Sequence, residues 1–233
     1  MTKTALVLIP GLLCNDAVWA SQVHRLAPDF DIQIPDLRNF DSLEAMGKSV
    51  LHSAPPHFHV AGHSMGGRVA FEIVRLAPER VQSLILLDTG VHPVTEAEPG
   101  KRQVYLDLAE AQGILAVARE WIPPMIHPER RYDRELIDSI VAMVTSYSVE
   151  QFKGQINALL NRRDMNPLLS EIECPTLVAC GREDGWATLA QHEAIAAAIR
   201  GAELSVIENS GHMVSMEQPA AVTSLLVDWL TRH

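Results

Sequence analysis

One serine of the sequence lies among glycines in a pattern that suits a nucleophile. Residues 60–69 read VAGHSMGGRV, so Ser64 has Gly62 two positions before it and Gly66 two positions after it. Glycine weakens strands and costs about 1 kcal/mol in a helix relative to alanine, so the cluster needs a structural reason. A tight turn from strand to helix requires small residues at both positions and presents the serine hydroxyl above a sheet. The segment therefore predicts a nucleophile elbow at Ser64.

The same glycines are poorly placed to bind a phosphate group, which is the other common use of a glycine-rich turn. No lysine follows them, and neither the G-x-G-x-x-G nor the P-loop spacing is present. A chance cluster is the plainer alternative. The apolar run before Ser64 and the apolar helical pattern after it favour the elbow.

A serine hydroxyl is a weak nucleophile and needs a neighbouring base. After an elbow of this kind, the acid and the histidine follow later in the chain, on loops at the carboxyl ends of strands. GRED follows the apolar run 176–180 and places Asp184 on a loop. ENSGHMVSMEQP follows the run 204–207 and places His212 on the next loop. We therefore expect His212 to be the base and Asp184 to orient it.

Other acids and histidines fit these roles less well. Asp88 ends the apolar run 83–87 and is kept as an alternative acid, whereas Glu183 stands one position too early. His63 neighbours the serine and is expected to pack in the interior. His192 begins HEAIA, which lacks the second histidine of a zinc-binding helix, so no metal site is predicted.

Attack on a carbonyl group also needs donors for the negative charge that develops on its oxygen, and backbone N–H groups can serve. The N–H of Met65, at the start of the helix, is one expected donor. The other is the N–H of Leu12, on the turn that Pro10 and Gly11 make after the apolar run 5–9.

That first apolar run has a second interpretation. Lys3 followed by ALVLIPGLLC resembles the core of a signal peptide that ends at a lipid-modified cysteine. Pro10 and Gly11 interrupt the run, and the large Leu13 stands where a small residue should precede the cysteine. A buried strand that leads to the oxyanion turn is the better interpretation.

The composition limits the class of protein. The 233 residues suit one large domain or a domain with an insertion. A formal net charge of −10 argues against binding to nucleic acid, which needs clustered cations. No apolar stretch is long enough to span a membrane. The 3 cysteines form no C-x-x-C pair, so we expect a reducing, cytoplasmic location and no disulfide framework.

Short apolar runs alternate with amphipathic helical stretches over most of the chain. Such runs indicate a mostly parallel sheet covered by helices on both faces, an α/β fold. The expected strands lie at residues 5–9, 32–34, 58–61, 83–87, 176–180 and 204–207. Residues 93–167 break the alternation, because their apolar residues recur at helical spacing without a convincing strand. We therefore expect a core formed by residues 1–92 and 168–233, with a helical cap inserted at 93–167.

These motifs resemble those of the α/β-hydrolase superfamily, in particular small serine esterases and lactonases with a helical cap. GHSMGG, GREDGWAT and SGHMVSMEQP match that family's nucleophile, acid and histidine motifs in order and spacing, and the likeness covers nearly the whole chain. The resemblance implies Ser64 as nucleophile, His212 as base and Asp184 as its orienting acid. It also implies Leu12 and Met65 as oxyanion donors. Dehalogenases and epoxide hydrolases of this fold use an aspartate nucleophile, so Ser64 at the elbow argues against both.

Three stretches depart from the family's pattern. Pro10 and Gly11 stand in place of the usual His-Gly, DLRNFDS is shorter than the usual glycine-rich loop, and residues 185–188 include no proline after the acid. These departures alter the walls of the pocket and leave the chemistry in place.

We therefore expect a serine hydrolase that cleaves small to medium carboxylic esters, lactones or thioesters through an acyl-enzyme, with no cofactor and no metal. The side chains expected to contact the substrate are Trp19, Trp121, Met125 and Trp186. Arg130, Arg131 and Arg134 form a basic patch that a carrier-protein substrate could use, as in the pimeloyl-carrier methyl esterases that this chain also resembles. A solvated face is the plainer interpretation of that patch.

Two other functions stay open. Some relatives use the same serine and histidine as a lyase or to cleave carbon–carbon bonds, and no residue here excludes that. A non-catalytic receptor for a small ligand would use the same scaffold with negligible turnover. Detection of an acyl-enzyme would favour ester cleavage over both.

Overall fold

The strand, turn and helix expected around Ser64 are present. In the computed structural model, which describes residues 3–233, strand β3 (Phe58–His63) ends directly before Ser64 and helix α3 (Met65–Leu76) begins directly after it. Every residue of β3 is buried. Burial on both faces is typical of a central parallel strand that is covered by helices on each side.

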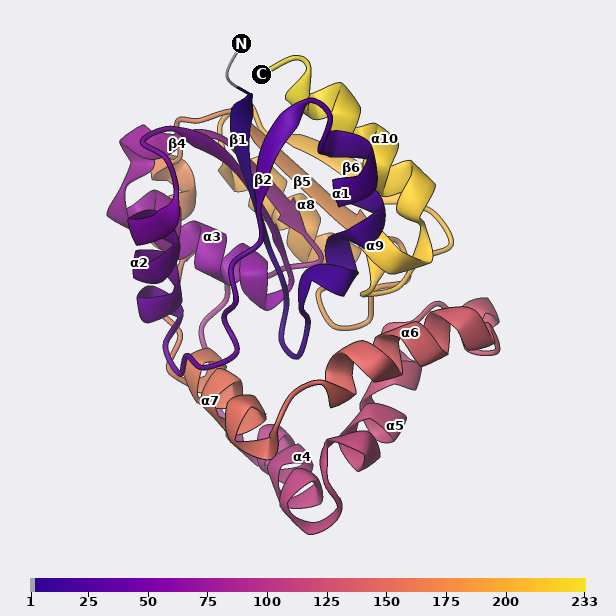
Figure 1. Cartoon of the computed structure of the whole chain (residues 1–233). Coiled ribbons are helices and arrows are strands. Elements are labelled where there is room, and N and C mark those ends of the chain that lie inside the picture. The colour runs from indigo at the N-terminus through magenta and orange to yellow at the C-terminus, as the bar shows by residue number, and fades with distance from the viewer. Residues whose placement is uncertain (1–2) are drawn as a thin grey trace.

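Six parallel strands form one sheet in the order β2-β1-β3-β4-β5-β6 (Figure 1). The other strands are β1 (Thr4–Ile9), β2 (Phe30–Gln33), β4 (Val81–Leu87), β5 (Thr176–Gly181) and β6 (Glu203–Ile207). Each lies within two residues, at either end, of the range that the sequence predicts. Because all pairs are parallel, the carboxyl ends of the strands lie at one edge of the sheet.

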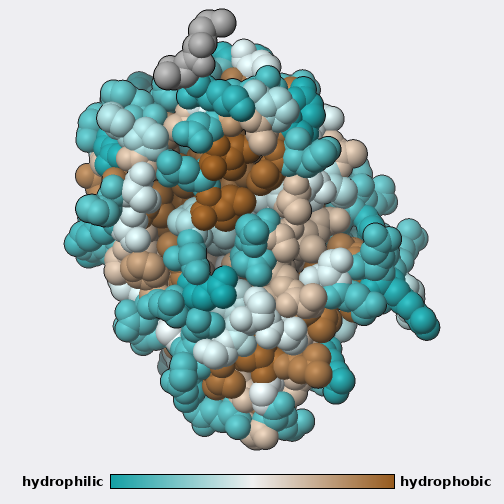
Figure 2. Space-filling model, viewed as in Figure 1, coloured by the Kyte–Doolittle hydropathy of each residue, from teal (hydrophilic) through white to brown (hydrophobic). Residues whose placement is uncertain are grey.

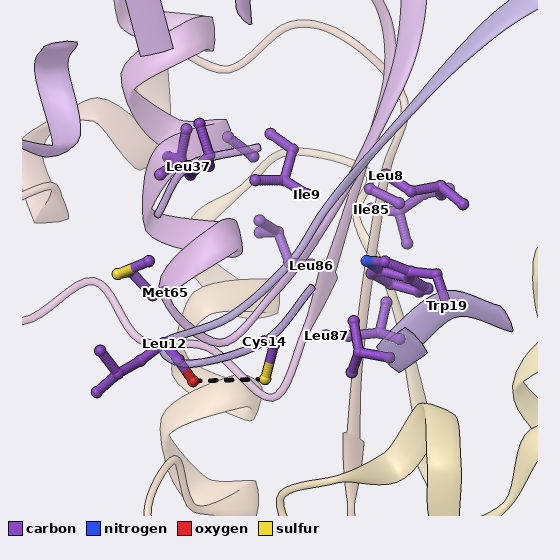
Figure 3. Packing of buried hydrophobic residues seen from close by; sticks show 14 of the residues in the cluster. Leu8, Ile9, Leu12, Cys14, Trp19, Leu37, Met65, Ile85, Leu86 and Leu87 are labelled. Atoms are coloured by element: carbon purple, nitrogen blue, oxygen red, sulfur yellow. Dashed lines mark hydrogen bonds between the residues drawn. The ribbon is translucent and has the colours of Figure 1, made fainter. Parts of the chain in front are cut away.

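Helices cover both faces of this sheet, which confirms the predicted fold class. Helices α1 (Ala20–Leu26) and α10 (Pro219–Leu230) pack together on one face, and α2 (Leu43–Ser53) packs with α3 on the other (Figure 1). Helix α8 (Leu189–Ala198) contacts β5 and β6. Figure 3 shows part of the hydrophobic core between these layers, where side chains of β1 and β4 pack together.

Four further α-helices lie between β4 and β5. They are α4 (Glu98–Gln112), α5 (Ile114–Met125), α6 (Arg134–Thr145) and α7 (Val149–Leu160). Helix α4 packs against α5 and α7, and α5 packs against α6. Figure 1 shows these helices, coloured from magenta to orange, as a separate layer beyond the carboxyl ends of the strands. They therefore face the edge of the sheet at which Ser64 lies.

Smaller elements complete the chain. A short helix, α9 (Val214–Glu217), follows the predicted histidine loop and was not expected from the sequence.

On the face shown in Figure 2, hydrophilic residues predominate, and hydrophobic residues gather near the edge strand β2 and over part of the separate helical layer. Within residues 3–233, no helix combines the length and apolar character that a membrane crossing requires. All three cysteines are free.

Candidate active site

The backbone at Ser64 is strained in the way that an elbow requires. Its φ is 54° and its ψ is −116°, a region that costs a non-glycine residue about 1–3 kcal/mol. A Cβ added to Gly62 would lie 2.3 Å from the carbonyl oxygen of Gly66, and one added to Gly66 would lie 2.2 Å from the carbonyl oxygen of Ile9. These distances are far below any carbon–oxygen contact, so the turn admits only glycine on both sides of the serine.

Hydrogen bonds on both sides hold the strained residue in place. The Ser64 N–H donates to the carbonyl oxygen of Leu87 on β4, at 2.9 Å. The Thr89 hydroxyl donates to the carbonyl oxygen of Ser64, at 2.7 Å. Strain of this kind persists where neighbouring structure over-determines the conformation. Strand β4 and the turn after it supply that constraint.

The three residues expected to form a triad are hydrogen-bonded in a chain. Ser64 Oγ lies 2.8 Å from His212 Nε2, and His212 Nδ1 lies 2.8 Å from Asp184 Oδ2. The other carboxylate oxygen of Asp184 accepts from the backbone N–H groups of Trp186 and Ala187, at 2.7 and 3.0 Å. This geometry orients the imidazole with Nε2 toward the serine hydroxyl, as a general base requires.

The surroundings of Asp184 favour the ionised form of its carboxylate. Burial opposes its negative charge, but the adjacent His212 ring and the two backbone N–H groups outweigh burial and lower the pKa of Asp184. An ionised carboxylate in this position can stabilise a protonated imidazole ring beside it.

Asp88, the alternative acid, does not contact His212. Its carboxylate accepts from the backbone N–H of Gly181 at 2.9 Å and from that of Val214 at 3.2 Å. It therefore ties the end of β5 to the start of α9. Burial, together with the charge of Asp184, raises the pKa of Asp88.

The loop that carries His212 is held on several sides by hydrogen bonds that the sequence did not predict. His63 Nε2 donates to the carbonyl oxygen of His212 at 2.8 Å. The buried Glu217 carboxylate accepts from the N–H groups of Gly211 and Met213, at 2.9 and 3.2 Å, which flank the histidine. The only signal for Glu217 was its place in the motif SGHMVSMEQP. His63 packs in the interior as expected, but it also fixes the histidine loop.

The expected oxyanion donors lie beside Ser64. Leu12 and Met65 both line the pocket that Ser64 opens into, and Figure 3 shows their side chains on the same side of the strands. Neither backbone N–H donates to another protein group within residues 3–233. The turn is fixed from outside, because the N–H of Leu13 donates to Gln155 Oε1 on α7 at 2.9 Å. Gln155 was not identified from the sequence.

A pocket of about 470 Å³ lies between the sheet edge and the separate helices. Trp121 of α5 and Trp186 both line it, with ring centroids 5.3 Å apart, and the Trp186 ring lies 5.9 Å from that of His212. Met125 instead lines a small neighbouring hollow of about 10 Å³. Trp19, which we expected to contact the substrate, does not line the pocket. Its side chain is fully buried, packs edge-on to His63, and lies across the strands from Met65 (Figure 3). It therefore belongs to the core.

His192 has a structural position. Its Nε2 accepts from the backbone N–H of Thr89 at 2.9 Å, and its Nδ1 bonds the carbonyl oxygen of Thr188 at 3.0 Å. Both ring nitrogens are therefore occupied. Over the described part of the chain, no three His, Cys, Asp or Glu side chains gather in a way that could hold a metal ion.

Comparisons with known proteins agree with this fold. The family described as alpha/beta hydrolase matches residues 6–225. A pimeloyl-[acyl-carrier protein] methyl ester esterase of Pectobacterium carotovorum is 30% identical over 78% of this chain and 77% of its own length. The structure of a thermophilic esterase from Thermogutta terrifontis, with malate bound, is 29% identical and covers 99% of this chain and 90% of that one, with a TM-score of 0.93. The enol-lactonase from Burkholderia xenovorans is 22% identical, covers 99% of this chain and 92% of that one, and has a TM-score of 0.88, so it shows a shared fold.

The chain therefore belongs to the alpha/beta hydrolase family, and it is an enzyme of that fold.

Proposed function

We propose that this protein is a serine hydrolase that cleaves carboxylic esters through an acyl-enzyme. The observation that carries the proposal is the unbroken hydrogen-bonded chain from Ser64 Oγ through His212 to Asp184. This chain opens into a pocket that is large enough for a small or medium ester. The esterases among the similar proteins support the same reaction class.

In the first half-reaction, Ser64 Oγ attacks the ester carbonyl carbon while His212 Nε2 takes the hydroxyl proton. The carbonyl oxygen becomes an oxyanion, which accepts from the N–H groups of Leu12 and Met65. The bond to the alcohol oxygen then breaks, and His212 returns its proton to that oxygen. The products of this step are a free alcohol and an acyl group on Ser64.

In the second half-reaction, water takes the place of the alcohol. His212 Nε2 takes a proton from the water as its oxygen attacks the acyl carbon. The bond to Ser64 Oγ breaks, and the proton passes to the serine. The acid leaves, and the residues return to their starting protonation states.

Residues 93–167 serve in this proposal as a cap that covers the site. Three pocket-lining side chains come from α7, namely Phe152, Ile156 and Leu159, and Trp121 comes from α5. Apolar walls favour binding of the hydrocarbon part of an ester. The remaining chain, residues 1–92 and 168–233, forms the core that holds the reacting groups.

The charges on the surface of the cap favour a small-molecule ester over a substrate that is bound to a carrier protein. The segment of residues 129–138 holds three arginines but also four acidic side chains. Arg130 pairs with Asp133, at 2.6 Å, and also bonds the carbonyl oxygen of Glu217. The patch is therefore not a surface of net positive charge, which docking of an acidic carrier protein would use.

Hydrolysis of neutral p-nitrophenyl acetate, butyrate and octanoate tests the proposal. We expect the wild-type protein to turn over at least the shorter esters, and Ser64→Ala to lose about 10³-fold or more in rate. Ser170→Ala, which alters an exposed serine outside the pocket, should retain the wild-type rate. If wild type and Ser64→Ala release p-nitrophenol equally slowly, ester cleavage is wrong, and lyase or receptor function replaces it.

A further inference from the structure

The pocket beside Ser64 and His212 carries excess positive charge, although the formal net charge of the chain is −10. Four cationic side chains line it, against two carboxylates. The cations are Arg68, Lys101, Arg102 and Arg162, and the carboxylates are Asp88 and Glu98. A gathering of cations inside the pocket of an acidic protein requires a specific cause, because like charges repel one another.

The carboxylate of Glu98 is shared between two of the arginines. It lies 2.5 Å from Arg162 Nη2 and 2.7 Å from Arg102 Nη2. Burial opposes ionisation of Glu98, but the hydrogen bonds and charges of Arg162 and Arg102 lower its pKa to about 2. Glu98 therefore carries its full negative charge at neutral pH and neutralises only one of its two partners.

Arg68 forms no direct ion pair with any described carboxylate, although the charge of Glu98 acts on it from a greater distance. No carboxylate oxygen of residues 3–233 lies within the 4.0 Å that defines an ion pair with its guanidinium. One of its nitrogens, Nη1, donates to the carbonyl oxygen of His92 at 3.2 Å. The planar guanidinium group carries five N–H donors, so most of its capacity is unused. Such an unpaired fork matches the geometry of a carboxylate.

The electrostatic consequences of the cluster are visible in the pKa values of its members. Burial, followed by the charge of Arg162, lowers the pKa of Arg68 to about 9. Burial and the charges of Arg68 and Arg162 also lower the pKa of His92, so this ring adds no charge at neutral pH. Arg68 remains protonated at pH 7, and an anion in the pocket would relieve the repulsion among these cations.

Arg68 also lies close to the nucleophile. It follows Ser64 by four residues at the start of α3, which is one helical turn or about 6 Å along the axis. Side chains of a helix lean toward its N-terminus, which here is the serine end. A Cβ added to the pocket-lining Gly90 would lie 3.1 Å from Arg68 Nη2, so this nitrogen faces the pocket wall.

Two spaces of different size adjoin the serine. Ser64 and His212 line both the larger pocket and a small hollow of about 10 Å³, which has room only for a group about the size of methyl. The four cationic side chains line the larger pocket alone. An acyl chain that reaches Arg68 therefore occupies the larger pocket and leaves the hollow for a small alcohol.

We propose that Arg68, assisted by the positive charge of Arg102 and Arg162, binds a free carboxylate at the far end of the acyl chain. The substrate is then a monoester of a short dicarboxylic acid with a small alcohol. This assignment rests on the proposed ester hydrolysis and adds the chemical class of the acid.

The test compares monomethyl glutarate and monomethyl adipate with the matching dimethyl esters, with released methanol as the readout. We expect the wild type to favour the monoesters in kcat/KM by about tenfold to hundredfold, the effect of a hydrogen bond between charged groups. Arg68→Gln should lower that ratio by at least tenfold, mainly through KM, and Arg68→Lys should restore part of it. Arg119→Gln, which removes an exposed arginine of α5, should leave the ratio unchanged.

A binding measurement separates this inference from the reaction itself. Calorimetry with monomethyl glutarate and Ser64→Ala should show binding that the additional change Arg68→Gln weakens by tenfold or more. If neutral p-nitrophenyl esters are hydrolysed but the monoester-to-diester ratio is the same in wild type and Arg68→Gln, the carboxylate site is wrong and ester hydrolysis stands. If no ester is hydrolysed but glutarate monoester binds through Arg68, the reaction is wrong and the carboxylate site stands.

Discussion

Acidification should destabilise the fold through His63, the last residue of β3, which directly precedes Ser64. The side chain is buried, and its Nε2 donates to the carbonyl oxygen of His212 at 2.8 Å. Burial, and secondly the charge of His212, lower the pKa of His63 to about 4 from a usual value of 6.5. Asp88 Oδ2 lies 3.8 Å from the same nitrogen, but burial raises the pKa of Asp88, which weakens its pull on the His63 proton.

The sign and size of the effect follow from these pKa values. A histidine whose pKa is lower in the folded than in the unfolded chain binds more protons when unfolded, so acid favours unfolding. The contribution of neutral His63 to the free energy of unfolding is fully present above pH 6.5 and is lost as the pH falls toward 4. Between pH 8 and pH 4.5, His63 alone should lower the free energy of unfolding by about 2.5 kcal/mol.

Urea unfolding at pH 8 and pH 4.5 measures this loss. The acidic side chains also titrate in this range, so the informative quantity is the difference between wild type and His63→Gln, which cannot gain a proton there. We expect the variant to lose about 2.5 kcal/mol less than the wild type between the two pH values. His24→Gln, which alters an exposed histidine of α1, should behave as the wild type. An identical pH dependence in wild type and His63→Gln would refute the reasoning.

Three substitutions probe how the site is held. Asp184→Asn should lower kcat by about 10⁴-fold on neutral esters with little effect on stability, because the amide no longer favours the required imidazole tautomer. Gly66→Ala should prevent folding or lower the free energy of unfolding by more than about 3 kcal/mol, as measured by urea unfolding, because its Cβ would lie 2.2 Å from the carbonyl oxygen of Ile9. Gln155→Ala should lower kcat about tenfold while KM changes less, because the N–H of Leu13 loses the acceptor that fixes the oxyanion turn.

Control variants and contrary outcomes test each of these three predictions. Gly185→Ala meets no atom within 4 Å and should unfold as the wild type, so equal stability of the two glycine variants would contradict the packing argument. Full activity of Asp184→Asn would show that another acid orients the histidine. Asn157→Ala, which alters an exposed residue of the same helix, should keep the wild-type kcat, so an equal loss in this variant and in Gln155→Ala would exclude the positioning role.

The sequence predicted those features whose causes are local. The glycines around Ser64 are required by contacts within a few residues and with one neighbouring strand, so the elbow could be read from a short segment. The inner strands could be predicted because a buried parallel strand is apolar on both faces, whereas the edge strands β2 and β6 are only partly buried. The order of Ser64, Asp184 and His212 followed from the elbow and from the loops after later apolar runs, and the structure brings the three side chains into one hydrogen-bonded chain.

Features that depend on distant segments could not be predicted in this way. Gln155 reaches the turn at Leu13 across 142 positions of sequence, and a buried glutamine on a helix gives no sign of its partner. Arg68 looked like an ordinary helix residue, because only the fold brings Arg102 and Arg162 to the same pocket. Trp19 was misplaced for the same reason: proximity to the oxyanion turn in sequence did not reveal which side of the sheet its ring occupies.

The central claim is that Ser64 becomes acylated during turnover. Acid quenching of the protein during hydrolysis of p-nitrophenyl butyrate, followed by mass analysis of its peptides, measures this directly. The account predicts one butyryl group on the peptide that contains Ser64, and its absence in Ser64→Ala. Continued turnover with no adduct, or an adduct on a different residue, would contradict it.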